Sequence, residues 1–172
     1  FKKEKFDLAV KWCTKAAEQG HMEAQKNLGL CYKRGIGVEQ NNARAVEWLT
    51  KAAEQGCGQA QYNLGLYFQY VEGDDQDLGK AINLYTRSAL QGFPLAQLEL
   101  GLCYQKGTGV PENLAKAVKL FIKAAEQGHP LAQCILGCCL FDGKGIEKCI
   151  DKGIMWITKA AEQGQGEASF AL

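Results

Sequence analysis

The sequence has little proline and histidine, and no long apolar run. There are 3 Pro and 2 His among 172 residues, and scarce proline favours helices because proline disrupts them. No apolar run reaches the roughly 20 residues of a membrane-spanning helix. The 20 Lys and Arg nearly balance the 19 Asp and Glu, so the sequence does not predict nucleic-acid binding or a polybasic membrane contact.

Glycine, in contrast, is abundant, and its 20 copies follow an internal repeat. The motif Lys-Ala-Ala-Glu-Gln-Gly occurs at 15–20, 51–56, 123–128 and 159–164, with a degenerate copy at 87–92. Successive copies are 36 residues apart. Leu-Gly pairs and Gly-x-Gly steps keep the same period, which is typical of a repeat architecture.

Each unit is predicted to form two helices. In the second unit, Asn41 or Asn42 can cap the first helix, and the apolar positions from Ala45 to Ala53 form a helical stripe. Gly56 can end that helix in a left-handed conformation, and Ala60 begins the stripe of the second helix.

Four of the predicted second helices contain a central glycine. These residues are Gly29, Gly65, Gly101 and Gly137. Because glycine inside a helix costs about 1 kcal/mol, we expect tight packing of the two helices within a unit and of each second helix against the next first helix.

The predicted fold is all-α: one right-handed α/α superhelix, or solenoid, of 36-residue helix-turn-helix units. The units are expected at about 5–40, 41–76, 77–112, 113–148 and 149–172, the last one partial, with a started second helix at 165–172. Neither end shows a polar capping repeat, which suggests a fragment of a longer chain.

The repeated residues resemble the Sel1-like repeat of the tetratricopeptide-like superfamily. The resemblance rests on Trp48 followed by 51–56, on Ala60-Gln61 with Leu64-Gly65, and on Gly-x-Gly-Val at 35–38 and 107–110. It implies a scaffold or adaptor that holds partner proteins on the concave face of the first helices.

The eight cysteines are predicted to be free thiols. Cys13, Cys31, Cys103, Cys138 and Cys139 share positions with large apolar residues of other units. Secreted Cys-rich relatives pair cysteines at positions that hold Ala and Gln here, so the resemblance implies that their disulfides are absent. A reducing, cytoplasmic compartment is favoured, with Cys57 and Cys149 the most exposed thiols.

No motif predicts catalysis or a cofactor. His21 and His129 stand at equivalent positions of distant units, without an orienting acid for a Cys–His pair. The glycine motifs match neither a phosphate-binding loop nor a dinucleotide fingerprint. A hydrolase, or a thiol-metal site at Cys134, Cys138, Cys139 and Cys149, is a remote alternative. We therefore predict a non-enzyme without a cofactor.

The exposed face of the first helices is the predicted partner-binding site. One position there varies most from unit to unit, as Lys11, Glu47, Asn83, Lys119 and Met155, and a rim is predicted at Lys80, Lys116 and Lys152. Alternatively, this face is simply a solvated charged surface.

The turn within the second unit, after its second helix, departs from the repeat. Val71 replaces its first glycine, and Tyr70, Glu72, Asp74 and Asp75 could form a second, acidic surface. Ordinary decay of the repeat is the alternative. A rival function for the whole chain is a self-assembling array through its uncapped ends. The partner polypeptide itself is not identified by the sequence.

Overall fold

A computed structural model describes residues 2–71, 73 and 76–164, with the backbone alone at 2–7. Within these ranges the chain forms nine α-helices. They are α1 (Lys2–Glu18), α2 (Met22–Arg34), α3 (Asn42–Glu54), α4 (Gly58–Tyr70), α5 (Leu78–Leu90), α6 (Pro94–Lys106), α7 (Leu114–Glu126), α8 (Pro130–Asp142) and α9 (Ile150–Glu162). None of them is long and apolar enough to cross a membrane. The predicted helix at 165–172 lies outside the described residues.

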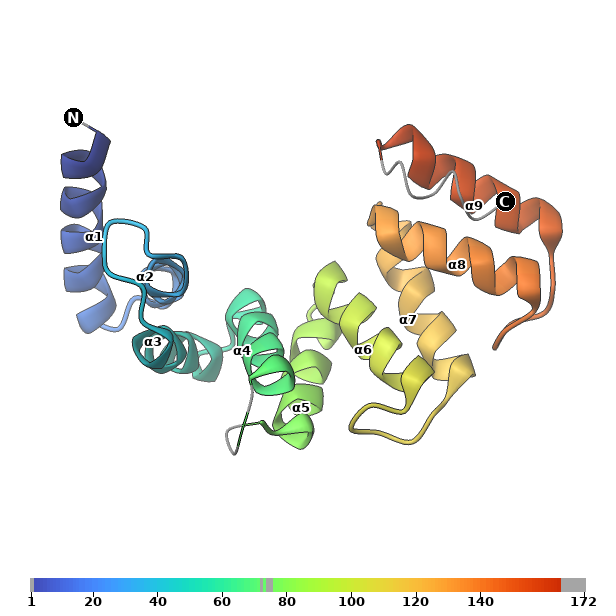
Figure 1. The fold of residues 1–172 in the computed structure, drawn as a ribbon, viewed down its shortest axis with the longest axis horizontal. Coiled ribbons are helices and arrows are strands. Elements are labelled where there is room, and N and C mark those ends of the chain that lie inside the picture. Colours follow the sequence, from blue (N-terminus) through green and yellow to red (C-terminus); the bar gives the residue numbers. More distant parts are fainter. Residues whose placement is uncertain (1, 72, 74–75, 165–172) are drawn as a thin grey trace. The chain divides into compact units, whose positions relative to one another are not determined.

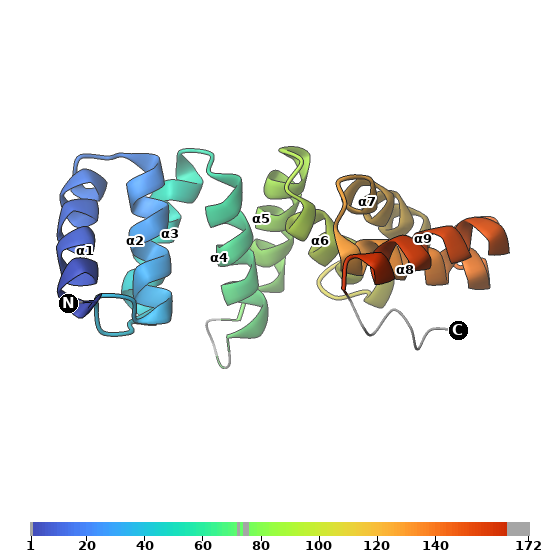
Figure 2. The ribbon, with the colours of Figure 1, turned by 90° about the horizontal axis from the view of Figure 1, so that it is seen from above.

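The helices belong to two compact units, residues 1–84 and 85–172, whose boundary falls inside α5. In unit 1, α2 packs against α1 and α3, and α3 packs against α4 (Figure 1). In unit 2, α6, α7, α8 and α9 pack in chain order, as Figure 2 shows from above. The all-helical architecture is therefore confirmed, while the right-handed superhelix and its concave face stay predictions.

Side chains at one repeated position start the first helices, as predicted. The Oδ1 atoms of Asn41, Asp77 and Asn113 accept hydrogen bonds of 2.8–2.9 Å from the backbone N–H three residues later. Cys149 has the same extended backbone before α9 but makes no capping bond. A repeated polar residue is thus sufficient to identify these helix starts.

Glycine ends most of the second helices. Gly35, Gly107 and Gly143 follow α2, α6 and α8 with φ of 68°, 70° and 75°, the left-handed region that favours glycine. Val71 follows α4 instead and has φ −66° and ψ 136°. Because a β-branched residue avoids the left-handed region, the chain leaves α4 in an extended conformation.

The central glycines of α2, α6 and α8 bring neighbouring helices together. A Cβ at Gly29 would lie 2.7 Å from Leu49 Cγ, and one at Gly101 would lie 2.5 Å from Phe121 Cε1. At Gly137 the distance to Ile157 Cγ1 would also be 2.5 Å. These distances confirm the predicted close approach of a second helix to the next first helix.

Buried glutamines connect successive helices, which the sequence analysis did not anticipate. In unit 2, Gln133 is fully buried, and its Nε2 donates to the Ala125 carbonyl at 3.1 Å. Its Oε1 accepts a 2.8 Å bond from Gln163 Nε2. Equivalent amide hydrogen bonds run from Gln127 Nε2 to Gln97 Oε1 at 2.8 Å and, in unit 1, from Gln55 Nε2 to Gln25 Oε1 at 2.6 Å.

All eight cysteines are free thiols, but one prediction of exposure was wrong. Cys57 is only 6% exposed because it packs with Ala52, Ala53 and Ala60 at the start of α4. Cys149 is half-buried. The error arose because a residue just after a helix-ending glycine can still turn inward and extend the core.

Candidate functional site

The variable position of the first helices is exposed throughout. Lys11, Glu47, Asn83, Lys119 and Met155 all present exposed side chains, which is the accessibility that partner binding requires. Their role in binding stays a prediction.

Glu47 is held by interactions within its own helix. Its Oε1 lies 2.7 Å from Lys51 Nζ, and that ammonium lies 4.1 Å from the centroid of the Trp48 ring. Lys15 and Lys159 lie over Trp12 and Trp156 in the same way, at 4.8 and 5.1 Å. Each of the three tryptophan rings thus makes a cation–π contact with a lysine of its own helix, on the exposed side of α1, α3 and α9.

Two of the three predicted rim lysines pack on aromatic rings of the preceding helix. Lys80 lies 5.3 Å from the centroid of Phe68 and 3.1 Å from Asp77. Lys116 lies 5.3 Å from the centroid of Tyr104. At the equivalent position one repeat before Lys80, Arg44 lies 5.5 Å from the centroid of the Tyr32 ring. In each case the aromatic residue stands twelve positions before the cation in the sequence, a spacing that could have predicted these contacts.

Lys152 has no such ring, and a cavity opens beside it. The residue twelve positions before it is Leu140, and the two residues line a cavity of about 530 Å³ between α7, α8 and α9. The equivalent space in unit 1 is only about 280 Å³, with Tyr32 and Arg44 among its lining residues. We attribute the larger volume to the aliphatic side chain at position 140.

The lining of this cavity, which we call the Lys152 cavity, combines apolar walls with charges of both signs. Ile122, Leu136, Ile146 and Trp156 contribute apolar surface, and Glu126, Glu147, Lys148 and Lys152 contribute the charges. Lys119 lies one helical turn before Ile122 on the same side of α7. The structure therefore places two predicted site residues, Lys119 and Lys152, in one region of unit 2.

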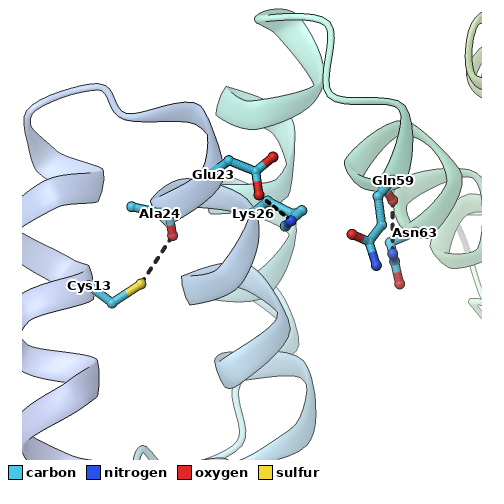
Figure 3. A network of polar contacts seen from close by, with 6 residues as sticks. All are labelled: Cys13, Glu23, Ala24, Lys26, Gln59 and Asn63. Carbon is cyan, nitrogen blue, oxygen red and sulfur yellow. Dashed lines mark hydrogen bonds and ion pairs between the residues drawn. The ribbon is translucent and has the colours of Figure 1, made fainter. Parts of the chain in front are cut away.

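The second predicted surface is represented by Tyr70 alone, since Glu72, Asp74 and Asp75 lie outside the described residues. Tyr70 is 64% exposed and lines a separate cavity of about 360 Å³ between α2, α3 and α4. Lys33, another residue of this lining, donates from Nζ to Asn63 Oδ1 at 3.2 Å. The Asn63 amide in turn donates to the Gln59 carbonyl at 2.8 Å (Figure 3).

Burial shifts the pKa values of two of the thiols and of one histidine. Burial, together with the charge of Glu99, raises the pKa of Cys103 to about 11, and burial also raises the pKa of Cys139. Because the thiolate is the reactive form, these thiols are weak nucleophiles. His129 Nδ1 accepts a 3.4 Å bond from the Ala132 N–H at the start of α8, and burial lowers its pKa.

The four cysteines of the remote alternative, Cys134, Cys138, Cys139 and Cys149, all lie within the described residues and do not form a metal-binding group. Over the described ranges, no three His, Cys, Asp or Glu side chains come together in a metal-binding arrangement. Cys139 is buried in the core of unit 2, and Cys134 and Cys138 pack beside Ile157 and Ala160. These contacts account for the three thiols as packing residues.

The paired helices, their 36-residue period and the glycine turns between them define a helical-repeat protein of the tetratricopeptide-like class. The Sel1 repeat profile matches residues 3–21, 23–57, 58–93, 94–129 and 130–165. The chain belongs to the Sel1 repeat family. The family profile divides the same period at another point, pairing each second helix with the first helix that follows it.

Solved structures of similar proteins agree with this assignment. A protective antigen present in uropathogenic Escherichia coli strains is 38% identical, with a TM-score of 0.88 over 92% of this chain and 34% of its own. A Sel1 repeat protein from Oxalobacter formigenes is 36% identical, with a TM-score of 0.87 over 94% of this chain and 64% of its own. The chain thus spans less than two thirds of either relative.

A more distant similarity concerns the fold alone. An immunity protein from Pseudomonas aeruginosa is 23% identical, with a TM-score of 0.60 over 94% of this chain and 58% of its own. No curated protein sequence matches the chain significantly.

Proposed function

We propose that this chain is a non-catalytic scaffold that binds a partner polypeptide on the exposed face of its first helices. Membership of a scaffold family supports binding in general. The observation that carries the proposal for this chain is the Lys152 cavity, where the repeated aromatic residue is missing and an open, mixed surface takes its place.

The chemistry of the cavity indicates what it would bind. Ile122, Leu136 and Trp156 can bury an apolar side chain of the partner. Glu126 and Lys152 offer one charge of each sign at its edge, which would fix the orientation of the bound segment more than its affinity. We therefore expect an apolar residue flanked by charged residues in the partner.

Filling the cavity tests this proposal. Leu140→Tyr introduces the ring that Tyr32 and Tyr104 supply in other repeats, so the fold should accept it. Leu131→Tyr is the matched control, because it adds the same ring to an exposed position of α8 outside the cavity. The immobilised variants and the unaltered chain are compared by affinity capture with quantitative mass spectrometry.

We expect a protein that the unaltered chain and L131Y both retain to be lost, by at least about tenfold, with L140Y. Thermal unfolding of L140Y should occur at an unchanged or higher temperature. Equal capture by all three proteins would contradict the assignment of the binding face.

A second candidate function, self-assembly, is favoured by one specific observation. Leu8 and Trp12 of α1 are 56% and 61% exposed, which is unusual for adjacent large apolar residues on one helix face. Sedimentation velocity over a range of concentrations tests this candidate. Growth in size that Trp12→Gln abolishes would support self-assembly, and a constant monomer would exclude it.

We also propose that the protein resides in a reducing compartment, because its eight thiols are unpaired. The test is to alkylate protein from its native source at lysis under denaturing conditions, so that the buried thiols also react, and to count the alkylated cysteines by mass spectrometry. Fewer than eight alkylated cysteines would contradict the proposal.

A further inference from the structure

The cavity between α2, α3 and α4, which we call the Lys33 cavity, has a lining suited to an anionic ligand. Among the described residues that line it, Lys33 is the only charged side chain. The other lining residues are Asn42, Ala45, Val46, Leu49, Asn63, Leu66, Tyr67, Tyr70 and Val71. A single cation thus lies beside an otherwise neutral, largely apolar surface.

Lys33 is a half-buried cation whose ammonium donates a hydrogen bond to a neutral amide oxygen. Asn63 orients that oxygen toward Lys33, because the other end of its amide is bonded to the Gln59 carbonyl. Burial, with the nearby charge of Arg34, lowers the pKa of Lys33. A carboxylate would form a stronger, charge-assisted bond with this ammonium than the amide does.

The walls and size of the cavity restrict the remainder of the ligand. Ala45 and Leu49 are buried beneath it, and Val46, Leu66 and Tyr67 are half-buried at its sides. A volume of about 360 Å³ is near the lower end of the roughly 300–1,000 Å³ range of ligand sites. It therefore fits one or two side chains better than a long folded element.

We propose that the Lys33 cavity binds a partner polypeptide segment in which a Glu or Asp side chain adjoins a large apolar residue. The carboxylate bonds Lys33 Nζ, and the apolar side chain packs against Leu49 and Tyr67. This site goes beyond the proposed function, because it uses the buried side of α3, whereas Glu47 lies on the exposed side of the same helix.

The residue at position 33 distinguishes this repeat from the two that follow it. The residues one and two periods later are Gln69 and Gln105, so the repeat itself does not require a lysine. Lys33→Gln therefore removes the charge while retaining a residue type that the fold accepts. Lys106→Gln is the matched control, with the same change in charge at an exposed position of α6.

The probe is an acetylated and amidated peptide, Gly-Gly-Glu-Phe-Gly-Gly, compared with the same peptide carrying Gln for Glu. Binding is measured by chemical-shift titration of backbone amides in α3 and α4. We expect the Glu peptide to bind at least about tenfold more tightly than the Gln peptide, the typical effect of losing a charge-assisted hydrogen bond. Lys33→Gln should abolish this difference, and Lys106→Gln should retain it.

Three results would overturn the proposal. Equal binding of the Glu and Gln peptides would show that Lys33 does not select a carboxylate. If a Gln peptide with a free carboxyl end binds as tightly as the blocked Glu peptide, the cavity selects the terminal carboxylate of a chain and not a Glu or Asp side chain. If the Glu peptide binds only to a variant that combines Glu72→Gln, Asp74→Asn and Asp75→Asn, the cavity belongs to the protein's own carboxylates. The peptide comparison needs no altered protein, so it stays decisive if a variant fails to fold.

Discussion

At the residue scale, Cys149 is a weak point in an otherwise regular set of helix starts. Its backbone has φ −147° and ψ 95°, close to the −149° and 103° of Asn41 and the −153° and 90° of Asn113. The two asparagines accept a hydrogen bond from the third residue of their helices, whereas Cys149 makes no capping bond. The backbone at 149 is therefore already arranged for a cap that its side chain cannot provide.

Cys149→Asn is expected to stabilise the protein by about 0.5–1 kcal/mol. The gain comes from the new bond to the Lys152 N–H, within the usual range of about 0.5–2 kcal/mol for N-caps, less the lost packing of the half-buried thiol. Chemical denaturation measures the change in the free energy of unfolding. Asn113→Ala is the matched control and should lose about 1 kcal/mol. If C149N is neutral while N113A is destabilising, the side chain at 149 cannot reach the helix.

At the element scale, the central glycines determine how closely two helices approach. Phe121 is fully buried, and three of its ring atoms would lie within 3.2 Å of a Cβ at Gly101. Such separations are shorter than van der Waals contact, so an added methyl group must displace the ring or the helix. Two opposite effects therefore meet at this position, because alanine also raises helix propensity by about 1 kcal/mol.

We expect the steric effect to prevail, so that Gly101→Ala destabilises the protein by about 1–3 kcal/mol, the usual cost of overpacking. Phe121→Ala, which removes the ring, should suppress this steric loss when combined with G101A. A double-mutant cycle of unfolding free energies measures that coupling. Additive losses in the two variants would disprove a direct contact between residues 101 and 121.

At the scale of the whole molecule, periodicity explains what the sequence could predict. Features that recur every period were recognised, such as the caps at Asn41 and Asn113 and the close approach at Gly101. The buried glutamine at 133 was missed because a polar residue inside a helical pattern resembles a surface residue. Its burial depends on bonds to Ala125 and Gln163, which sequence spacing alone does not reveal.

The cavities were missed for a related physical reason. The volume of the Lys152 cavity depends on Leu140 in place of an aromatic residue, and the charge in the Lys33 cavity depends on Lys33 in place of glutamine. Periodicity averages over such differences, whereas the volume and charge of a cavity depend on particular side chains. The candidate binding surfaces therefore required the packed structure, although the helices around them did not.

The glutamine bonds also predict how stability is distributed along the chain. Gln133 joins the end of α7 to α8 and, through Gln163, to the end of α9. In a repeat protein each unit is stabilised mainly by its nearest neighbours. Removing this side chain should thus weaken α8 and α9 locally.

Gln133→Ala is expected to cost about 1–3 kcal/mol, because it removes the buried hydrogen bond to the Ala125 carbonyl and the one accepted from Gln163. Native-state hydrogen exchange should show faster exchange in α8 and α9 and an unchanged rate in α2 and α3. Gln163→Ala is the matched control: it removes the bond to Gln133 and a longer bond to the Lys159 carbonyl but leaves the buried Gln133–Ala125 bond in place, so its effect on the same helices should be smaller. Equally accelerated exchange in all helices would mean that the chain unfolds as one cooperative body, and the nearest-neighbour account of its stability would be wrong.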